Sequence, residues 1–140
     1  DELWVDYPGP QENGNLSDVH WLALLHPTGI GLLVVTTDTP LNMSVRRFSQ
    51  EQIETSNYSW DLETSPLSYL EVAGKVNGVG GNDSWGATAM EPYRLENENT
   101  AFSFWLVSFR GGEEEARRLG REVMSWQAEY SDPNGSGEGH

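Results

Sequence analysis

The strongest constraint on the fold is an apolar run late in the chain, residues 101–109. As an extended strand, this run would place aromatic and aliphatic side chains on both of its faces. One face would carry Phe102, Phe104 and Leu106, and the other Trp105, Val107 and Phe109. The run therefore predicts a β-strand in the centre of a sheet, because it has too much apolar surface to lie at an edge.

Two further runs predict a β-hairpin. Residues 19–26 and 31–37 are almost continuously apolar and rich in β-formers, and a short loop with Pro27 and Gly29 joins them. Near-continuous apolarity indicates strands that are buried on both faces, as in a sheet of a sandwich.

Residues 41–48 and 68–76 instead alternate between apolar and polar side chains, which is the pattern of a half-exposed strand. In the first of them the apolar face is Leu41, Met43 and Val45, and the polar face is Asn42, Ser44 and Arg46. Loops are expected at residues 57–66, which include Tyr58 and Trp60, and at residues 87–99, where residues 93–95 could form a short edge pairing.

Helical signals occur in two places. Ser49 and Gln52 have the spacing of a capping box, which predicts a short helix to about Ser56. After Gly111 and Gly112, one apolar stripe recurs at helical spacing, formed by Ala116, Leu119, Val123, Trp126 and Tyr130. The stripe must pack on something, and both the chain's own sandwich and a partner domain or second copy remain open. Residues 132–140 are expected to be a flexible tail.

Composition excludes several classes of function. A formal net charge of −14 repels phosphate backbones and anionic lipid, so nucleic-acid binding is not expected. No apolar run reaches the length of about 18–20 residues that a membrane span needs. The chain has no cysteine, and its histidines, His20, His26 and His140, do not cluster, so neither a metal site nor a cofactor is expected. A single glycine-rich segment without tandem repeats is also a weak calcium signal.

The segment most indicative of binding is residues 78–86, which contain four glycines. Asn82, Asp83 and Ser84 can cap the turns that these glycines allow, and Trp85 is then displayed on the loop. Such a ring can form one wall of a polar-ligand site, or it can fold back and plug the end of a β-sandwich. Local composition leaves both interpretations open.

Four segments in matching order and spacing resemble the C-terminal small-chain domain of the glycoside hydrolase family 2 β-galactosidases. They are residues 10–14, residues 18–22, residues 48–56 and the glycine loop at residues 78–86. The resemblance runs from about Tyr7 to Phe109, covers about the second half of that family's domain and includes none of its catalytic barrel. It implies an all-β fold, an antiparallel β-sandwich that is part of a supersandwich, here with a short helix and a C-terminal helix. The expected organisation is a sandwich over residues 1–110, a helix over 111–131 and the tail.

The resemblance also implies a function. The two catalytic glutamates of the family belong to the absent barrel, so no catalytic residue is assigned and the isolated chain is expected to be inactive. In the family, the loop tryptophan packs against the sugar, which makes Trp85 a substrate contact, while Asn82, Asp83 and Ser84 shape the loop. This chain reads Asn-Asp where many relatives read Asp-Asn.

The expected partners are galactosides, met through the parent enzyme, and the remaining domains of that enzyme, with a homo-oligomer possible. Two alternatives use other features of the sequence. An autonomous carbohydrate-binding module would explain the loop aromatics Tyr58, Trp60 and Tyr93. A structural or oligomerisation domain would explain the striped C-terminal helix.

Overall fold

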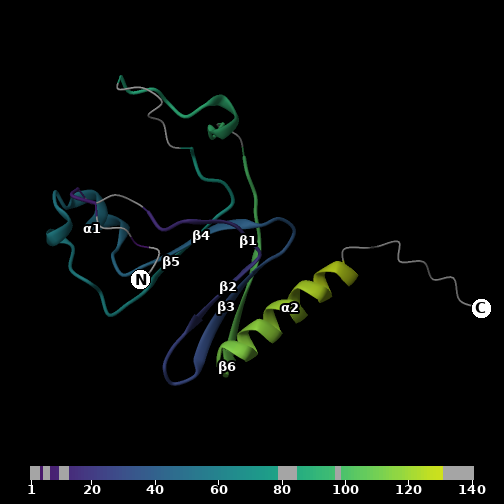
Figure 1. The fold of residues 1–140 in the computed structure, drawn as a ribbon. Coiled ribbons are helices and arrows are strands. Elements are labelled where there is room, and N and C mark those ends of the chain that lie inside the picture. The colour runs from purple at the N-terminus through teal and green to yellow at the C-terminus, as the bar shows by residue number, and fades with distance from the viewer. Residues whose placement is uncertain (1–3, 5–6, 10–12, 79–84, 97–98, 131–140) are drawn as a thin grey trace, which may run out of the picture. The chain divides into compact units, whose positions relative to one another are not determined.

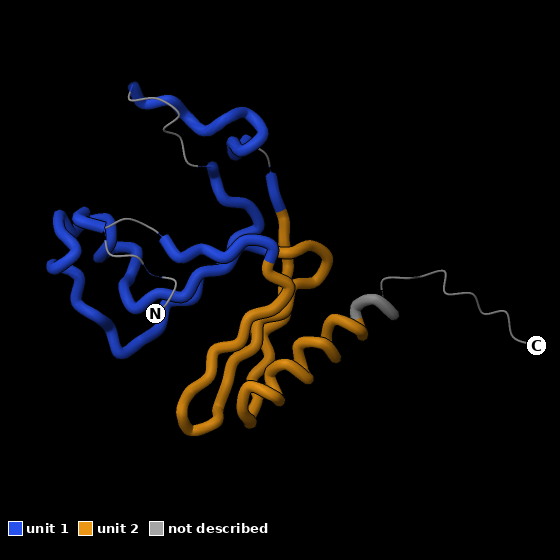
Figure 2. The backbone as a smooth tube through the Cα atoms, viewed as in Figure 1, with its two compact units in different colours: residues 1–18, 41–100 blue, residues 19–40, 101–140 orange. Residues whose placement is uncertain are grey.

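The computed structural model describes residues 4, 7–9, 13–78, 85–96 and 99–130, and for 127–130 the backbone only. Within these residues the chain forms two compact units, residues 1–18 with 41–100 and residues 19–40 with 101–140 (Figure 2). Unit 1 contains a three-stranded sheet of order β1-β4-β5, and unit 2 contains one of order β2-β3-β6 (Figure 1). The two helices are the short α1 (Gln50–Thr55) and the C-terminal α2 (Glu113–Tyr130). The expected class is confirmed: the chain is mostly antiparallel β-structure with few helices.

The predicted hairpin is present in unit 2. Strands β2 (Trp21–Leu25) and β3 (Ile30–Thr36) pair antiparallel. The turn between them is closed by the His26 amide, which donates to the Ile30 carbonyl at 2.8 Å. Burial on both faces is also confirmed for β3, since the consecutive residues Leu33, Val34 and Val35 are all fully buried.

Strand β6 (Phe104–Arg110) forms where the sequence predicts it, but the expected central position is wrong within the described part of the chain. The middle strand is β3, and β6 pairs with it on one side. Trp105 and Leu106 stay more than half exposed, at 55% and 57%. The prediction failed because it assumed that all of this apolar surface is buried within the sheet. The strand that is covered on both faces is β3, through the consecutive aliphatic residues Leu33, Val34 and Val35.

Helix α2 packs on one face of the β2-β3-β6 sheet. Leu33, Val35 and Val123 form the buried cluster, surrounded by Trp21, Ala23, Val107, Phe109, Leu119 and Met124. The helix lies close to the sheet at Gly120, where an added Cβ would fall 2.9 Å from the Trp21 indole. Ala116, Leu119 and Val123 thus use the predicted stripe to pack on the chain's own sheet, while Trp126 is 52% exposed and the Tyr130 side chain lies outside the described residues.

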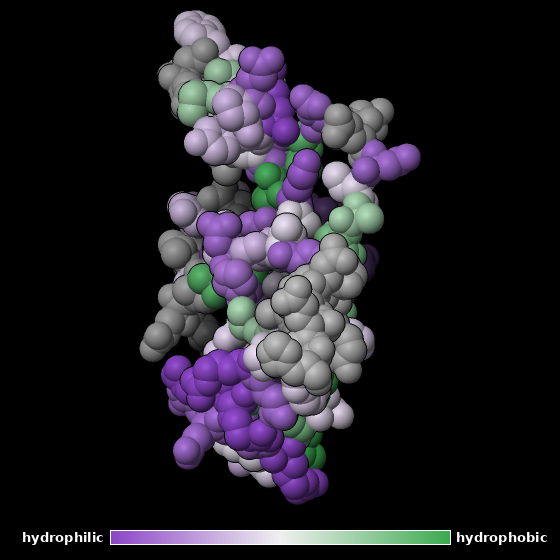
Figure 3. Space-filling model, turned by 90° about the vertical axis from the view of Figure 1, so that its right-hand side faces the viewer, coloured by the Kyte–Doolittle hydropathy of each residue, from purple (hydrophilic) through white to green (hydrophobic). Residues whose placement is uncertain are grey.

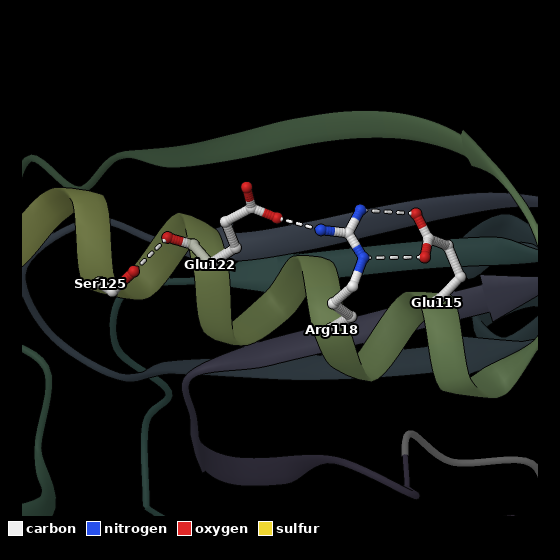
Figure 4. Close-up of polar contacts among 4 residues, drawn as sticks. All are labelled: Glu115, Arg118, Glu122 and Ser125. Carbon is white, nitrogen blue, oxygen red and sulfur yellow. Dashed lines mark hydrogen bonds and ion pairs between the residues drawn. The ribbon is translucent and has the colours of Figure 1, made fainter.

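The outer face of α2 carries a ladder of ion pairs. Arg118 donates two hydrogen bonds, of 2.9 and 2.8 Å, to the Glu115 carboxylate and contacts Glu122 on its other side (Figure 4). Glu113 and Arg117 form a further pair. Figure 3 shows a hydrophilic patch at the end of the molecule where α2 begins. Solvent screens these exposed pairs, so the apolar face of the helix provides its attachment.

In unit 1, β1 (Leu16–Val19) and β5 (Tyr69–Ala73) flank β4 (Leu41–Arg46). The prediction that β4 is half exposed is wrong. Ser44 and Arg46, from the expected polar face, are 3% and 5% exposed, whereas Val45 is 37% exposed. Arg46 is partly compensated for its burial, because it forms an ion pair with Glu71 of β5 and donates to the Gln50 side chain at 3.1 Å. Its Nε and the Ser44 hydroxyl are buried without a hydrogen-bond partner among the described residues.

The capping box of α1 is confirmed. The Ser49 hydroxyl accepts a hydrogen bond from the Gln52 amide at 3.1 Å, and the Ser49 amide donates to the Gln52 side chain at 3.0 Å. Ile53 anchors the helix and is 5% exposed. Phe48, just before the helix, packs against the ring of Trp4 with a centroid distance of 5.1 Å. This contact fixes part of the N-terminal arm.

Candidate functional site

Trp85 lies on the loop that follows β5, and it is 93% exposed. The backbone turns at Gly86, whose φ of 84° lies in the left-handed region that favours glycine. Of the four residues that the sequence assigns to the binding loop, only Trp85 can be placed, because Asn82, Asp83 and Ser84 lie outside the described residues. Trp85 is thus displayed to solvent in the structure of this chain.

The base of this loop is held by two hydrogen bonds between its arms. The Gly78 amide donates to the Tyr93 carbonyl at 2.6 Å, and the Leu95 amide donates to the Asn77 side chain at 3.0 Å. A side chain at position 78 would not fit, since a Cβ there would fall 2.6 Å from the Tyr93 Cβ and 3.2 Å from that of Ala89. The loop therefore leaves from and returns to a closed base.

The returning arm is braced by Arg94. Its Nε donates to the Ala89 carbonyl at 2.5 Å, and its Nη2 donates to the Thr88 hydroxyl at 2.8 Å. In place of the edge pairing that residues 93–95 could form, the structure has a single 3-10 turn, η2 (Glu91–Tyr93), and only single hydrogen bonds to residues 77 and 78. Sequence reasoning missed both roles, because Asn77 acts across the loop, 18 positions from Leu95, and Arg94 acts on residues 88 and 89 of an arm that has no regular pattern.

The loop and its arms display several large apolar side chains besides Trp85. Their exposed fractions lie between 48% and 61%, for Val76, Met90, Tyr93 and Leu95. Clusters of exposed apolar side chains in an ordered protein indicate a contact surface. The signal in the sequence was weak, because these residues are spread over 20 positions that read as an irregular loop.

A second aromatic group lies on the turn that follows α1. The rings of Tyr58 and Trp60 are stacked, with centroids 4.5 Å apart and planes at 9°. They flank the start of the 3-10 turn η1 (Ser59–Asp61) and are 51% and 74% exposed. The sequence predicts a loop with both aromatics here, and the structure adds that they contact each other.

A group of ion pairs lies on α2, and its carboxylates lack the character of a catalytic pair. The hydrogen bonds from Arg118 hold the pKa of the Glu115 carboxyl below its ordinary value. A general acid needs a pKa shifted in the opposite direction. Among the described residues no three His, Cys, Asp or Glu side chains gather as metal ligands, and no described helix is long and apolar enough to cross a membrane.

Comparison with known proteins identifies the family. The family model described as the β-galactosidase small chain matches residues 1–106. Similar proteins include the β-galactosidase of Halalkalibacterium halodurans, 32% identical over 90 residues, which are 64% of this chain and 9% of that protein. Those of Lactobacillus delbrueckii subsp. bulgaricus and Photobacterium profundum are 38% and 31% identical, over 62% and 76% of this chain and 8% and 10% of theirs.

The chain thus spans about a tenth of the length of the relatives that it matches. In those proteins the matched segment is one small part, which implies that other domains accompany it. The match ends at residue 106, before α2 begins at Glu113. The match of the family model over most of the sequence, together with these relatives, shows that the chain belongs to the β-galactosidase small-chain family.

Proposed function

We propose that this chain is the accessory part of a β-galactosidase, and that its Trp85 loop completes a galactoside-binding cleft whose catalytic residues lie in other domains. The observation that carries the proposal is the exposure of Trp85, at 93%, on a loop whose base is closed by hydrogen bonds. Burying an exposed indole against a sugar or a neighbouring domain releases free energy without first disrupting a core.

The membership of the family supports this role. The relatives are named β-galactosidases, and nine tenths of their length lies outside the match. A retaining glycosidase needs two carboxylates about 5–5.5 Å apart, one of them with a raised pKa. Glu115, whose pKa is lowered by Arg118, does not fit the role of that acid. We assign the catalytic pair to the remaining domains, which make up about nine tenths of the length of the relatives. Asn82, Asp83 and Ser84 are proposed to orient the loop tip.

The exposed apolar arms of the loop fit the same proposal. Val76, Met90 and Leu95 are each about half exposed, which suits residues that pack against another domain at the rim of a cleft. In that arrangement Trp85 contacts the sugar and the arms contact the protein. We expect the Trp85 loop of the isolated chain to bind galactosides only weakly, and the isolated chain to hydrolyse none.

The test is a chimeric enzyme. The segment of the L. delbrueckii β-galactosidase that aligns with this chain is replaced by residues 1–106, and Trp85→Ala is then introduced. A stacking contact is worth about 0.5–1.5 kcal/mol, so kcat/KM for a nitrophenyl galactoside should fall by up to about tenfold. Leu67→Ala is the matched control, since Leu67 is also an apolar side chain of unit 1 and is 64% exposed.

Two results would contradict the proposal. One is a chimera whose kinetics are the same with and without Trp85. The other is galactoside turnover by the free chain that disappears when one of its own carboxylates is replaced by the amide.

A further inference from the structure

We propose that Tyr58 and Trp60 form a second sugar contact, a platform on which a pyranose ring stacks apart from the Trp85 loop. This inference rests on the proposed function, because it takes galactosides as the sugars that the chain meets. We call the two stacked rings the aromatic platform.

The exposure of the two rings carries the geometric part of the argument. Their planes differ by only 9° and their centroids lie 4.5 Å apart, so each ring covers one face of the other. Trp60 is nevertheless 74% exposed. An indole that has lost one face to a neighbour can keep that exposure only if its other face is open, so the platform offers one flat ring surface to solvent.

The backbone holds the platform in place. The Asp61 amide donates to the Tyr58 carbonyl at 3.0 Å, and the Leu62 amide donates to the Ser59 carbonyl at 3.2 Å. The Asp61 carboxylate accepts a hydrogen bond from the Tyr58 amide at 3.1 Å, and the Ser59 amide donates to the carbonyl of Pro8 at 3.2 Å. Because the turn is closed before any ligand arrives, binding costs little ordering entropy.

The chemistry of the turn suits a pyranose. One face of a galactoside ring presents C–H groups, which pack on the negative face of an aromatic ring, while its hydroxyls point outward around the rim. Asp61 is exposed and lies directly beside the platform in sequence. A carboxylate can accept about four hydrogen bonds, so Asp61 has capacity for a sugar hydroxyl beyond the Tyr58 amide.

The surroundings favour a sugar over a protein as the occupant. Asn57, Asp61 and Glu63 are exposed polar residues next to the platform in sequence. A stable protein interface needs about 800 Å² per partner with an apolar centre, and two rings among polar residues do not supply it. A single sugar ring needs only one flat aromatic face and a few acceptors.

The platform and the Trp85 loop are held by different contacts within unit 1. The ring contact of the platform joins Tyr58 and Trp60, whereas the hydrogen bonds that close the Trp85 loop join residues 77 and 78 to residues 95 and 93. Removing either aromatic group should therefore leave the other in place. This separation allows the two sites to be tested independently in one molecule.

The test follows the indole N–H signals of the full chain by NMR during titration with methyl β-D-galactopyranoside. A single stacked ring fits a dissociation constant in the millimolar range, so the titration extends to about 100 mM. The backbone amide signals of Ser59 and Asp61, in the same turn, are followed in the same spectra because they survive replacement of Trp60. We expect the Trp60 indole signal and these amide signals to shift and saturate. Trp60→Ala should abolish the response of the amide signals, Trp60→Tyr should keep part of it, and Trp85→Ala should leave both responses unchanged. Trp126→Ala, which removes a half-exposed tryptophan on α2, is the matched control.

An acyclic polyol, xylitol, is titrated in parallel, because it carries hydroxyls without a flat C–H face. The inference is overturned if Trp60 does not respond to the galactoside in a folded chain, or if xylitol shifts it equally. It is also overturned if Trp60→Ala lowers the stability of the chimeric enzyme, even though the variant no longer responds to sugar. The platform would then contact a protein domain. None of these results touches the proposed function, whose failure would appear as kinetics of the chimera that do not depend on Trp85.

Discussion

The two units of this chain are stabilised by different means. Unit 2 is a helix on a sheet, in which Leu33 and Val35 are fully buried beneath α2. Unit 1 also buries apolar residues, but it additionally buries Arg46 and fixes its loops with hydrogen bonds that the Asn77 side chain accepts and the Arg94 side chain donates. Both proposed sugar contacts are in unit 1. The comparison teaches that polar bracing can order a display surface without covering it, whereas rings that pack on an apolar cluster, such as Trp21 and Phe109 of unit 2, become partly buried.

The largest effect is expected from Leu33→Ala, at the centre of the unit 2 cluster. Leu33 is fully buried, and truncating such a leucine leaves a cavity that lowers the free energy of unfolding by about 2–5 kcal/mol. Urea denaturation measures the loss. Leu67→Ala, at a residue of unit 1 that is 64% exposed, should change the free energy of unfolding by less than about 0.5 kcal/mol. Similar losses from the two variants would break the comparison.

Gly120→Ala should destabilise unit 2 by a smaller amount, although alanine is the better helix former. The helical preference favours alanine by about 1 kcal/mol. A Cβ at this position would lie 2.9 Å from the Trp21 ring, and an indole held against the cluster cannot move away freely. We expect overpacking to win and the net loss to be about 1 kcal/mol.

Thermal denaturation measures this change, with Arg121→Ala, an exposed site on the same helix, as the control. A stabilised Gly120→Ala would show that α2 is loosely attached to the sheet.

In unit 1, the loss of stability at the pair of Arg46 and Glu71 should depend on whether a buried charge is left unpaired, and not on how large a side chain is removed. Glu71→Gln leaves the buried Arg46 guanidinium without its counter-charge, whereas Arg46→Met removes the buried charge and leaves a carboxylate that is 44% exposed to water. We therefore expect Glu71→Gln to cost about 1–2 kcal/mol and Arg46→Met to cost less. Chemical denaturation of both variants gives the comparison, and the reverse order would show that the aliphatic part of Arg46 matters more than its charge.

The smallest effect is expected at the ion pairs of α2. Arg118 lowers the pKa of Glu115 in the folded chain. The pair therefore stabilises the folded chain at pH values above the ordinary pKa of 4.5, and this contribution is lost as the pH falls through the lowered pKa. The difference in Tm between the wild type and Arg118→Gln should narrow on acidification and in high salt. If the Tm difference between the two proteins widened at low pH, the pair of Arg118 and Glu115 would not be its source.

Local patterns in the sequence were enough for several elements. The capping box of Ser49 and Gln52 and the hairpin around Gly29 involve residues that are close in sequence, and both formed as predicted. Leu119 and Val123 of the predicted stripe pack on the chain's own sheet, whereas Trp126 stays half exposed. The burial of Arg46 could not be foreseen, because its partner Glu71 is 25 residues away.

The candidate sites show the same division between local and distant contacts. The glycines around Trp85 predict a loop but leave open whether its ring is displayed or folds back, and the hydrogen bonds that close the loop join residues up to 18 positions apart. The stacking of Tyr58 on Trp60 was likewise missed, although both were expected in one loop, because the contact depends on the shape of the turn. The edge position of β6 depends on which strands pair, and no single run of residues encodes that.

Because the base of the Trp85 loop is closed, the segment between residues 78 and 93 can be exchanged without changing the base. Because the bonds at Gly78 and Asn77 join the arms to each other, they do not require any particular residues at the tip. Lengthening a closed loop is inexpensive, since each doubling of its length costs about 0.6 kcal/mol of closure entropy. Selection, or an engineer, can therefore exchange the tip to suit a different glycoside while the sheet beneath it stays as it is.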